Sequence, residues 1–317
     1  MLLFVVRRLL QAVPVILFSA MVIFVLMRMA PGDPVAAQLG PDATPEQIQA
    51  MRQQLGLDQP IPAQFVQWLA NTAQGDLGRS YVNKYLVTEL IAQRMKATVQ
   101  LAVAGALLVL LLALPVGVLC ALNADKRMDV FLTSIVSILI SIPNFWFGVL
   151  AILFFAVTLH VLPPGGWADI TTDPGASLRS LVLPAITLSL NQAATLSRYV
   201  RACMLDVLGE LYVRTARGKG LPNRAVTWGH VLPNTLIPVL TILGIQLGRM
   251  FGGAVVVETV FAWPGLGRLL VTGIITRDYP VVQGVLLLMA MIFIVINLMT
   301  DVAYGIVDPR IRLAGKD

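Results

Sequence analysis

The hydrophobic positions of the chain form long uninterrupted runs separated by polar segments. A helix that crosses a bilayer needs about 20 mostly apolar residues, and six runs approach or exceed that length. They carry no charged side chain except Arg249 in the fifth, and they cover residues 9–27, 99–122, 130–159, 181–197, 236–257 and 281–300. Backbone polar groups in lipid must be satisfied within the segment. The pattern therefore predicts an all-α integral membrane protein with six transmembrane helices.

The composition excludes several other classes of protein. Of the 317 residues, 57% are hydrophobic and 13% are charged, and the mean hydropathy is +0.80. Soluble domains are about a quarter charged, and disordered chains are poor in apolar residues. The two cysteines exclude a disulfide scaffold. The net charge of +6 is small for this length, so we expect membrane lipid as the surroundings and no nucleic-acid partner.

The basic residues predict the orientation, because Lys and Arg are enriched in cytoplasmic loops. With both termini inside, the cytoplasmic segments hold thirteen Lys and Arg residues, and the two short outer segments hold three. The cytoplasmic segments are then 1–8, 123–129, 198–235 and 301–317, and the short outer segments are 160–180 and 258–280. The remaining segment, 28–98, is longer than the roughly 60 residues over which this rule counts. We expect it outside. The first run exceeds the about 7–15 residues of a signal peptide's apolar region, so it is expected to remain as a span.

The outer segment 28–98 is expected to be folded. Thr44-Pro45 is typical of a helix start, because threonine caps the first turn and proline suits the first helical position. Gly56 is expected to end that helix. A second amphipathic helix is predicted over 63–73, and 75–78 is expected to form a turn.

No set of residues indicates catalysis or a metal site. The two histidines, His160 and His230, fall on opposite sides of the membrane in the predicted topology, so they cannot share one site. The segment 218–220 reads Gly-Lys-Gly and lacks the hydroxyl that holds magnesium in a phosphate-binding loop. We therefore expect no catalytic residue, no metal and no cofactor on this chain, and ATP chemistry only on partner chains.

A spaced motif lies in the basic cytoplasmic loop. It reads Arg-Thr-Ala at 214–216, three residues, Gly220, nine residues, then His-Val-Leu-Pro at 230–233. This resembles the permease signature of bacterial ABC importers, Glu-Ala-Ala, three residues, Gly, nine residues, Ile-x-Leu-Pro. The spacing matches, while Arg214, Thr215 and His230 replace the usual residues. The arrangement predicts a helix, a glycine turn and a second helix, with small residues that let the first helix enter a groove on a partner.

Further motifs extend the resemblance over nearly the whole chain. The chain is similar to the dipeptide/oligopeptide/nickel permease family of ABC importers, and in particular to the first of its two permease subunits. The segments that carry the similarity lie in the family's order, at 7–9, 31–34, 55–58, 75–78, 208–221, 261–267, 277–283 and 308–312.

The resemblance implies a type I ABC importer permease fold in the bacterial inner (cytoplasmic) membrane. It also implies a second homologous permease, two ATP-binding subunits that bind ATP and Mg²⁺, and an extracytoplasmic substrate-binding protein. Coupling to the ATPases would involve Glu210, Tyr212, Arg214, Thr215, Ala216, Gly220 and Leu221. The family leaves open whether the substrate is a dipeptide, an oligopeptide, glutathione or a nickel chelate, and whether the ATPases are two chains or one fused chain.

Several charged or irregular positions invite a functional interpretation. A central Arg such as Arg249 costs about 2.5–3.5 kcal/mol on insertion scales. It is therefore either a substrate-pathway residue that holds a carboxylate, or an Arg that pairs with a helix carbonyl or extends outward to the membrane surface. Arg28 and Glu258 are expected to anchor the outer ends of spans. Pro143-Asn144 predicts a kink or an interruption, which either gates transport or bends a long helix.

Three rival functions predict other residues. A proton- or sodium-driven secondary transporter predicts Asp, Glu or His within the spans, and the six runs contain none. An intramembrane protease predicts a nucleophile and a base at membrane depth, and no histidine lies in the six runs. A purely structural membrane subunit predicts no particular residue and stays open.

Overall fold

The computed structural model describes residues 2–29, 34–40 and 42–307, and these residues are nearly all helical. The motif residues at 31–33 and 308–312 lie outside the described residues. The elements, in chain order, are α1 (Leu2–Met29), α2 (Pro34–Leu39), α3 (Pro45–Gln54), α4 (Ile61–Ala73), α5 (Val87–Leu122), α6 (Arg127–Ser141), α7 (Asn144–Ala151), the π-helical η1 (Ile152–Thr158), α8 (Pro174–Gly209), α9 (Leu211–Gly218), α10 (Asn223–Val226), η2 (Thr227–Val231, also π-helical), α11 (Leu232–Val260), α12 (Leu266–Ile275) and α13 (Tyr279–Val307).

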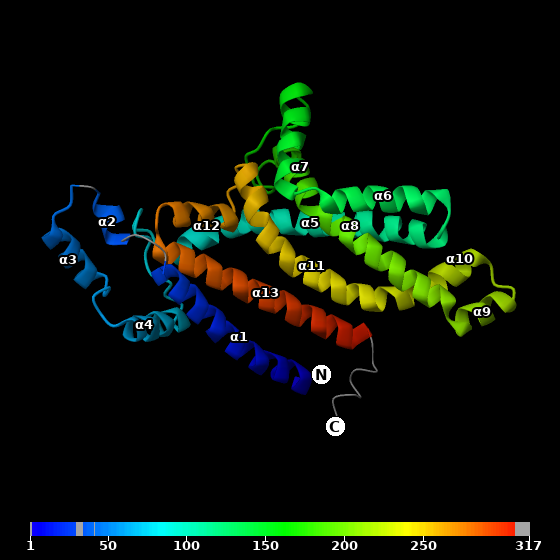
Figure 1. Ribbon diagram of the computed structural model, residues 1–317, viewed down its shortest axis with the longest axis horizontal. Coiled ribbons are helices and arrows are strands. Elements are labelled where there is room, and N and C mark those ends of the chain that lie inside the picture. Colours follow the sequence, from blue (N-terminus) through cyan, green and yellow to red (C-terminus); the bar gives the residue numbers. More distant parts are fainter. Residues whose placement is uncertain (1, 30–33, 41, 308–317) are drawn as a thin grey trace.

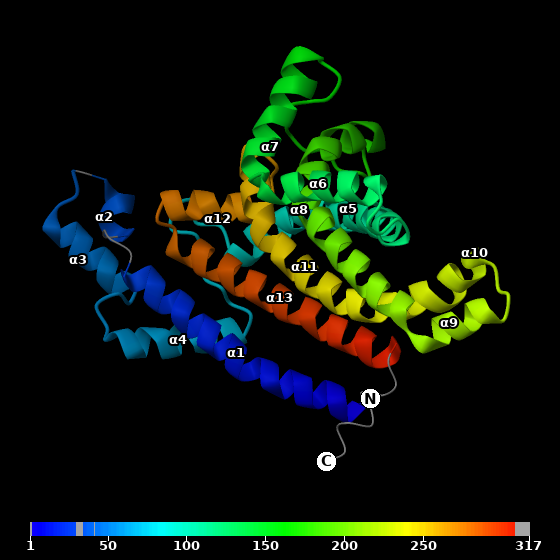
Figure 2. The same ribbon diagram turned by 45° about the vertical axis from the view of Figure 1, so that its right-hand side comes forward.

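The long helices lie side by side and carry the two loop regions at opposite ends (Figure 1). Helix α8 packs between α5 and α11, α11 also packs on α13, and α13 packs on α1. Helices α2, α3 and α4 gather at one end of this bundle, and α9 and α10 lie at the other end. Figure 2 shows the same separation from a second direction. The predicted outer segment and the predicted cytoplasmic loop thus lie at opposite ends of the molecule.

Each predicted span falls within helix, but one of them is divided. In the described part of the chain, α1, α5, α11 with its N-terminal extension, and α13 are long and apolar enough to cross a membrane. The expectation of one span over 130–159 is replaced by two helical pieces, α6 and α7–η1, that meet at an angle of 98°. The break falls at Ile142-Pro143, where both residues are extended, with ψ of 123° and 134°. Proline disfavours helix in the residue before it, which accounts for the position of the break.

Helix α8 contains the predicted span 181–197 and contributes to the centre of the main core. Leu188, Leu196 and Val200 on this helix are buried within that core. Helix α5 approaches closely through glycine, since a Cβ added at Gly117 would lie 2.6 Å from the Cβ of Val200. Small residues allow membrane helices to pack at short distance, so Gly117 positions α5 against α8.

The outer segment is folded as the sequence predicts. Thr44 caps α3 in a reciprocal pair of hydrogen bonds with Gln47, and Gly56 follows the helix with φ +65°. Helix α4 packs on α1 through three aromatic rings. Their centroids lie 5.3 Å (Phe24–Phe65), 5.7 Å (Phe24–Trp68) and 6.2 Å (Phe65–Trp68) apart.

Candidate functional site

The loop motif folds into a short helix with a glycine-dependent end. Helix α9 begins directly after Glu210, which also ends α8. At the far end the N–H of Gly220 donates to Arg217 O at 2.9 Å and the N–H of Leu221 donates to Ala216 O at 3.4 Å. This pair of bonds is the Schellman arrangement, which places the residue after the cap in the left-handed region. Gly220 has φ +83°, so the turn requires glycine.

One face of α9 is packed on its own chain. Val213 and Ala216 are buried together with Met204 of α8, Val226 of α10 and Val231 of η2. The small side chain of Ala216 therefore lets α9 approach its own chain. Of the two small residues of the motif, Ala216 thus faces its own chain, whereas Thr215 is exposed.

The opposite face of α9 and its surroundings are open. Leu211 and Trp228 are 76% and 65% exposed, which is high for apolar side chains. Tyr212, Arg214, Thr215 and Leu221 are exposed as well. Partial burial and the nearby Glu210 raise the pKa of Tyr212, so its phenol is neutral. The segment thus presents exposed apolar and basic side chains at the end of the bundle opposite α2–α4.

An ion pair fixes α6 to α8 on the side of α9, and the sequence analysis did not find it. Arg201 of α8 donates from Nε and Nη2 to the two carboxylate oxygens of Asp129, at 2.8 and 2.6 Å. The Asp129 side chain is 5% exposed and also accepts the N–H of Asp125 at 3.1 Å. The pair joins residues 72 positions apart, and no local pattern announces such a pairing.

Arg249 lies on an exposed face of α11. Ile245, Arg249, Gly252 and Val256 are exposed at the spacing of one helix face. Among the residues that the structure describes, no carboxylate pairs with Arg249. The substrate-pathway role of Arg249 stays a prediction.

The same face of α11 borders the break between α6 and α7. A cavity of about 350 Å³ is lined by Ile140–Phe145, Asn191 of α8, and Gly253 and Val256 of α11. Asn191 donates from Nδ2 to the carbonyl oxygen of Ile140 at 2.9 Å. Interrupted helices at membrane depth are tolerated where they line a cavity or are covered by protein. The exposed residues Ile245, Arg249, Gly252 and Val256 of α11 and the residues that line this cavity together form a candidate solute pathway. This surface is called the α11 face below.

Glu258 is not the interfacial anchor that the sequence suggested. Its side chain is fully buried and accepts hydrogen bonds from the Thr98 hydroxyl at 2.7 Å and from the N–H of Arg268 at 3.0 Å. The Thr98 hydroxyl oxygen in turn accepts the N–H of Leu266 at 2.8 Å. A Cβ at Gly265 would lie 2.1 Å from the Glu258 carboxylate, so that glycine makes room for it. Glu258 ties α11, α12 and α5 together.

Comparisons with known proteins identify the class to which this architecture belongs. Residues 113–313 match the family described as "Binding-protein-dependent transport system inner membrane component", and residues 1–102 match the N-terminal part of the same kind of component. A putative peptide transport system permease protein of Brucella abortus (strain 2308) is 41% identical over 306 residues, which cover 96% of this chain and 98% of the relative. A glutathione transport system permease protein, GsiC, of Escherichia coli O6:H1 is 41% identical over 312 residues, covering 98% and 99%.

Solved structures agree with the fold. An inward-facing structure of the MetNI methionine ABC transporter has a chain that superimposes with a TM-score of 0.59 at 21% sequence identity, covering 70% of this chain and 97% of that chain. The helical bundle is that of a type I permease. Proteins of this kind work with ATP-binding and substrate-binding partners. The chain belongs to the binding-protein-dependent transport system inner membrane component family and is a permease subunit of an ABC importer in the inner membrane.

Proposed function

We propose that this chain forms half of a peptide translocation pathway, with a second homologous permease forming the other half. The observation that supports this most strongly is the 41% identity, over nearly the full length of both chains, to a relative named as a peptide transport permease. The exposed α11 face agrees with it, because a pathway surface must stay uncovered by its own chain. The partner permease would close this surface.

Arg249 would hold the carboxylate of the peptide in transit. A guanidinium binds a carboxylate with two parallel hydrogen bonds, which fix both position and orientation. Arg249 is exposed on the α11 face, where such a bond replaces some of the solvation that the charge loses in the membrane.

The segment 210–221 would couple the permease to an ATP-binding subunit. Leu211 and Tyr212 supply apolar contact area, and Arg214 supplies charge at the rim. ATP and Mg²⁺ would bind to the two ATP-binding subunits, whether separate or fused, and hydrolysis would take place there. An extracytoplasmic binding protein would deliver the peptide at the opposite end of the bundle.

The test is uptake by the complete complex in liposomes, with the ATPases, the second permease and the binding protein present. Radiolabelled dipeptide, oligopeptide, glutathione and a nickel chelate are each offered with and without ATP. We expect ATP-dependent uptake of the dipeptide or oligopeptide. Uptake of glutathione alone would favour the second candidate, for which the relationship to the glutathione permease argues. Uptake of the nickel chelate alone, or uptake driven by an ion gradient without ATP, would contradict the proposal.

A further inference from the structure

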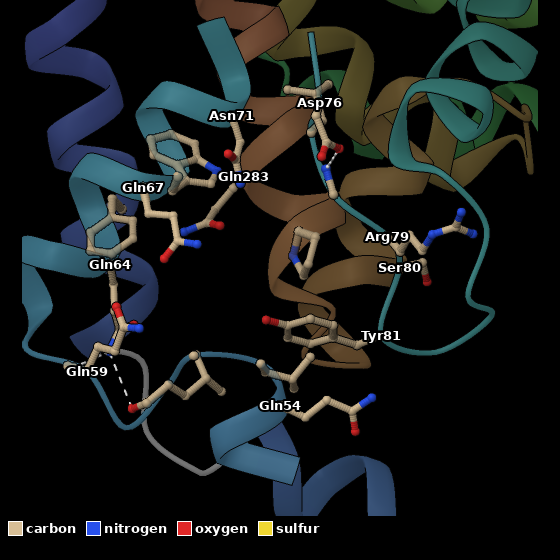
Figure 3. A pocket seen from close by; sticks show the side chains of 18 of the residues that line it. Gln54, Gln59, Gln64, Gln67, Asn71, Asp76, Arg79, Ser80, Tyr81 and Gln283 are labelled. Atoms are coloured by element: carbon tan, nitrogen blue, oxygen red, sulfur yellow. Dashed lines mark hydrogen bonds between the residues drawn. The ribbon is translucent and has the colours of Figure 1, made fainter. Parts of the chain in front are cut away.

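A cavity of about 780 Å³ lies at the end of the bundle that carries the outer segment. It is enclosed by α3, α4, the loop over 76–84, the end of α1 and the start of α13 (Figure 3). Its size is within the range of about 300–1,000 Å³ that is usual for small-ligand sites. None of its lining residues belongs to the α11 face. The outer cavity is therefore a separate feature from the proposed pathway.

The walls of the outer cavity are unusually rich in carboxamides. Seven of the 22 lining residues are Gln or Asn. Figure 3 shows Gln67, Asn71 and Gln283 directed toward one another across the space. A carboxamide offers both a carbonyl acceptor and an NH₂ donor, the two functions that a peptide group also carries. A lining of this kind is complementary to a ligand built from peptide bonds.

Buried polar atoms in this lining lack partners. Gln283 is 5% exposed, and its Nε2 has no hydrogen-bond partner. Gln64 donates from Nε2 to Leu57 O and Gln59 O, at 3.3 and 2.7 Å, while its Oε1 is buried and unpartnered. Leaving a buried polar group unsatisfied costs about 1–3 kcal/mol. If these two carboxamides turn toward the cavity, a bound ligand that donates to Gln64 Oε1 and accepts from Gln283 Nε2 would remove both costs.

Arg28 supplies a cation to the same space. Its guanidinium carbon lies 5.0 Å from the ring centroid of Phe24 and 5.9 Å from that of Tyr279, and its Nε is buried without a partner. No carboxylate in the described parts of the chain forms an ion pair with it. The carboxylate in the lining, Asp76, accepts the N–H of Gly78 at 2.8 Å. The aromatic rings hold the guanidinium in place and leave its charge for an external anion.

We propose that the outer cavity binds a short peptide, with its carboxylate on Arg28 and its peptide groups on the carboxamides that include Gln283. The choice of a peptide rests on the proposed function, but the site itself is a second one and needs neither ATP nor the partner permease. Peptide bound here would be held at the outer end of the permease, beside α1 and α13, before or apart from its passage along the α11 face.

The test is calorimetric titration of the full-length chain in lipid nanodiscs. Trialanine is the probe, and its C-terminal amide is the comparison ligand that lacks the carboxylate. We expect saturable binding of one trialanine per chain, and at least about tenfold weaker binding of the amide. Gln283→Leu is expected to weaken trialanine binding by at least about tenfold, because about 1.4 kcal/mol corresponds to that factor.

Matched variants separate the cavity from general damage. Gln246→Leu replaces another buried glutamine of a long helix, outside the cavity, and should leave binding unchanged. Gln67 is exposed on α4, so its replacement should not disturb folding. Gln67→Ala should weaken trialanine binding several-fold, and it tests the site even if Gln283→Leu fails to fold.

Absence of saturable trialanine binding to the wild type would overturn the proposal. Wild-type affinity for trialanine in both the Gln67→Ala and the Gln283→Leu variants would overturn it as well. Peptide uptake by the complete complex together with no binding in the outer cavity would reject this site alone. Binding without peptide uptake would reject the proposed function and retain the site.

Discussion

Single backbone positions carry much of the specificity at the end of α9. Gly220 has φ +83°, and a Cβ added there would meet nothing within 4 Å. The position therefore selects glycine for its backbone conformation and not for space. Sequence spacing found this residue because the requirement is local, within six residues of one turn.

The first prediction tests this backbone requirement. Gly220→Val should lower peptide uptake by at least about tenfold, because a β-branched residue in the left-handed region carries strain of about 1–3 kcal/mol and would shift the segment 210–221. Gly218→Val is the control, since Gly218 is exposed two residues earlier, within α9, and its added Cβ also meets nothing. Uptake and membrane yield are measured together. Equal loss in both variants would attribute the effect to side-chain bulk and contradict the role of φ.

Arg249 is the other single residue with a strong expectation. It is costly in a membrane span, exposed, and without an ion-pair partner in the described chain. Arg249→Leu should therefore reduce peptide uptake at least about tenfold while the yield of the assembled complex stays the same. Arg249→Lys should restore part of the activity, because lysine keeps the charge and loses the planar fork.

The control for Arg249 is Val256→Leu, a small apolar change on the same face of α11. It should leave uptake near the wild-type value. Poor assembly of both Arg249 variants with the second permease would show that Arg249 is an interface residue. Full transport by Arg249→Leu would end its assignment to the pathway.

At the scale of elements, long-range pairings fix the helices relative to one another. The Asp129–Arg201 pair joins the start of α6 to α8, at the end of α6 away from the break at Ile142-Pro143, where α7 departs at 98°. The break itself was anticipated from Pro143, because proline acts on its own neighbours. The bend angle was not anticipated, because Asn191 and Gly253 at the break come from other helices that are distant in the sequence.

Breaking this pair should loosen α6. Asp129→Asn keeps the shape but removes the charge, and we expect a loss of about 1–3 kcal/mol, moderated because Arg201 is 28% exposed. The apparent Tm of the purified complex in detergent should fall by about 2 °C or more. Asp125→Asn, four residues earlier and exposed, should change it little. An unchanged Tm for Asp129→Asn would show that packing alone holds α6.

Glu258 shows why some residue contacts could not be predicted from the sequence. A carboxylate at the end of an apolar run is compatible with an anchor in the headgroup region. Its actual partner, Thr98, is 160 residues away, and only the fold brings the two together. The same holds for the outer cavity, which Arg28, Gln64 and Gln283 form from three separate helices.

At the scale of the molecule, the apolar runs and the charge asymmetry were enough to predict an all-helical membrane protein with two distinct ends. The bundle places α2–α4 and α9–α10 at opposite ends (Figure 1), as that topology requires. The sequence predicts a span over 181–197, but α8 as a whole is not among the helices of the described chain that are apolar enough to cross a membrane. Its polar residues lower its hydropathy and are tolerated inside a protein environment.

Side-specific labelling tests this topology directly. Asn71→Cys and Asn223→Cys, each in a background that lacks Cys120 and Cys203, place one thiol at each end of the bundle, at exposed positions. In intact spheroplasts, an impermeant maleimide should label the first thiol and not the second. In inverted vesicles the result should be reversed. Labelling of both thiols in one preparation would contradict the orientation.

Because Glu210 both ends α8 and begins α9, the short helix is attached to a rod of 36 residues. At 1.5 Å per residue that rod is about 54 Å long. Val213 and Ala216 are seated against Met204 of the rod, so α9 cannot swing freely about the joint. If an ATP-binding subunit acts on α9, as proposed above, it would tilt α8, and a tilt of about 10° would displace the far end of α8 by about 9 Å. A single helix, α8, would then convert a small movement at one membrane surface into a larger movement at the other.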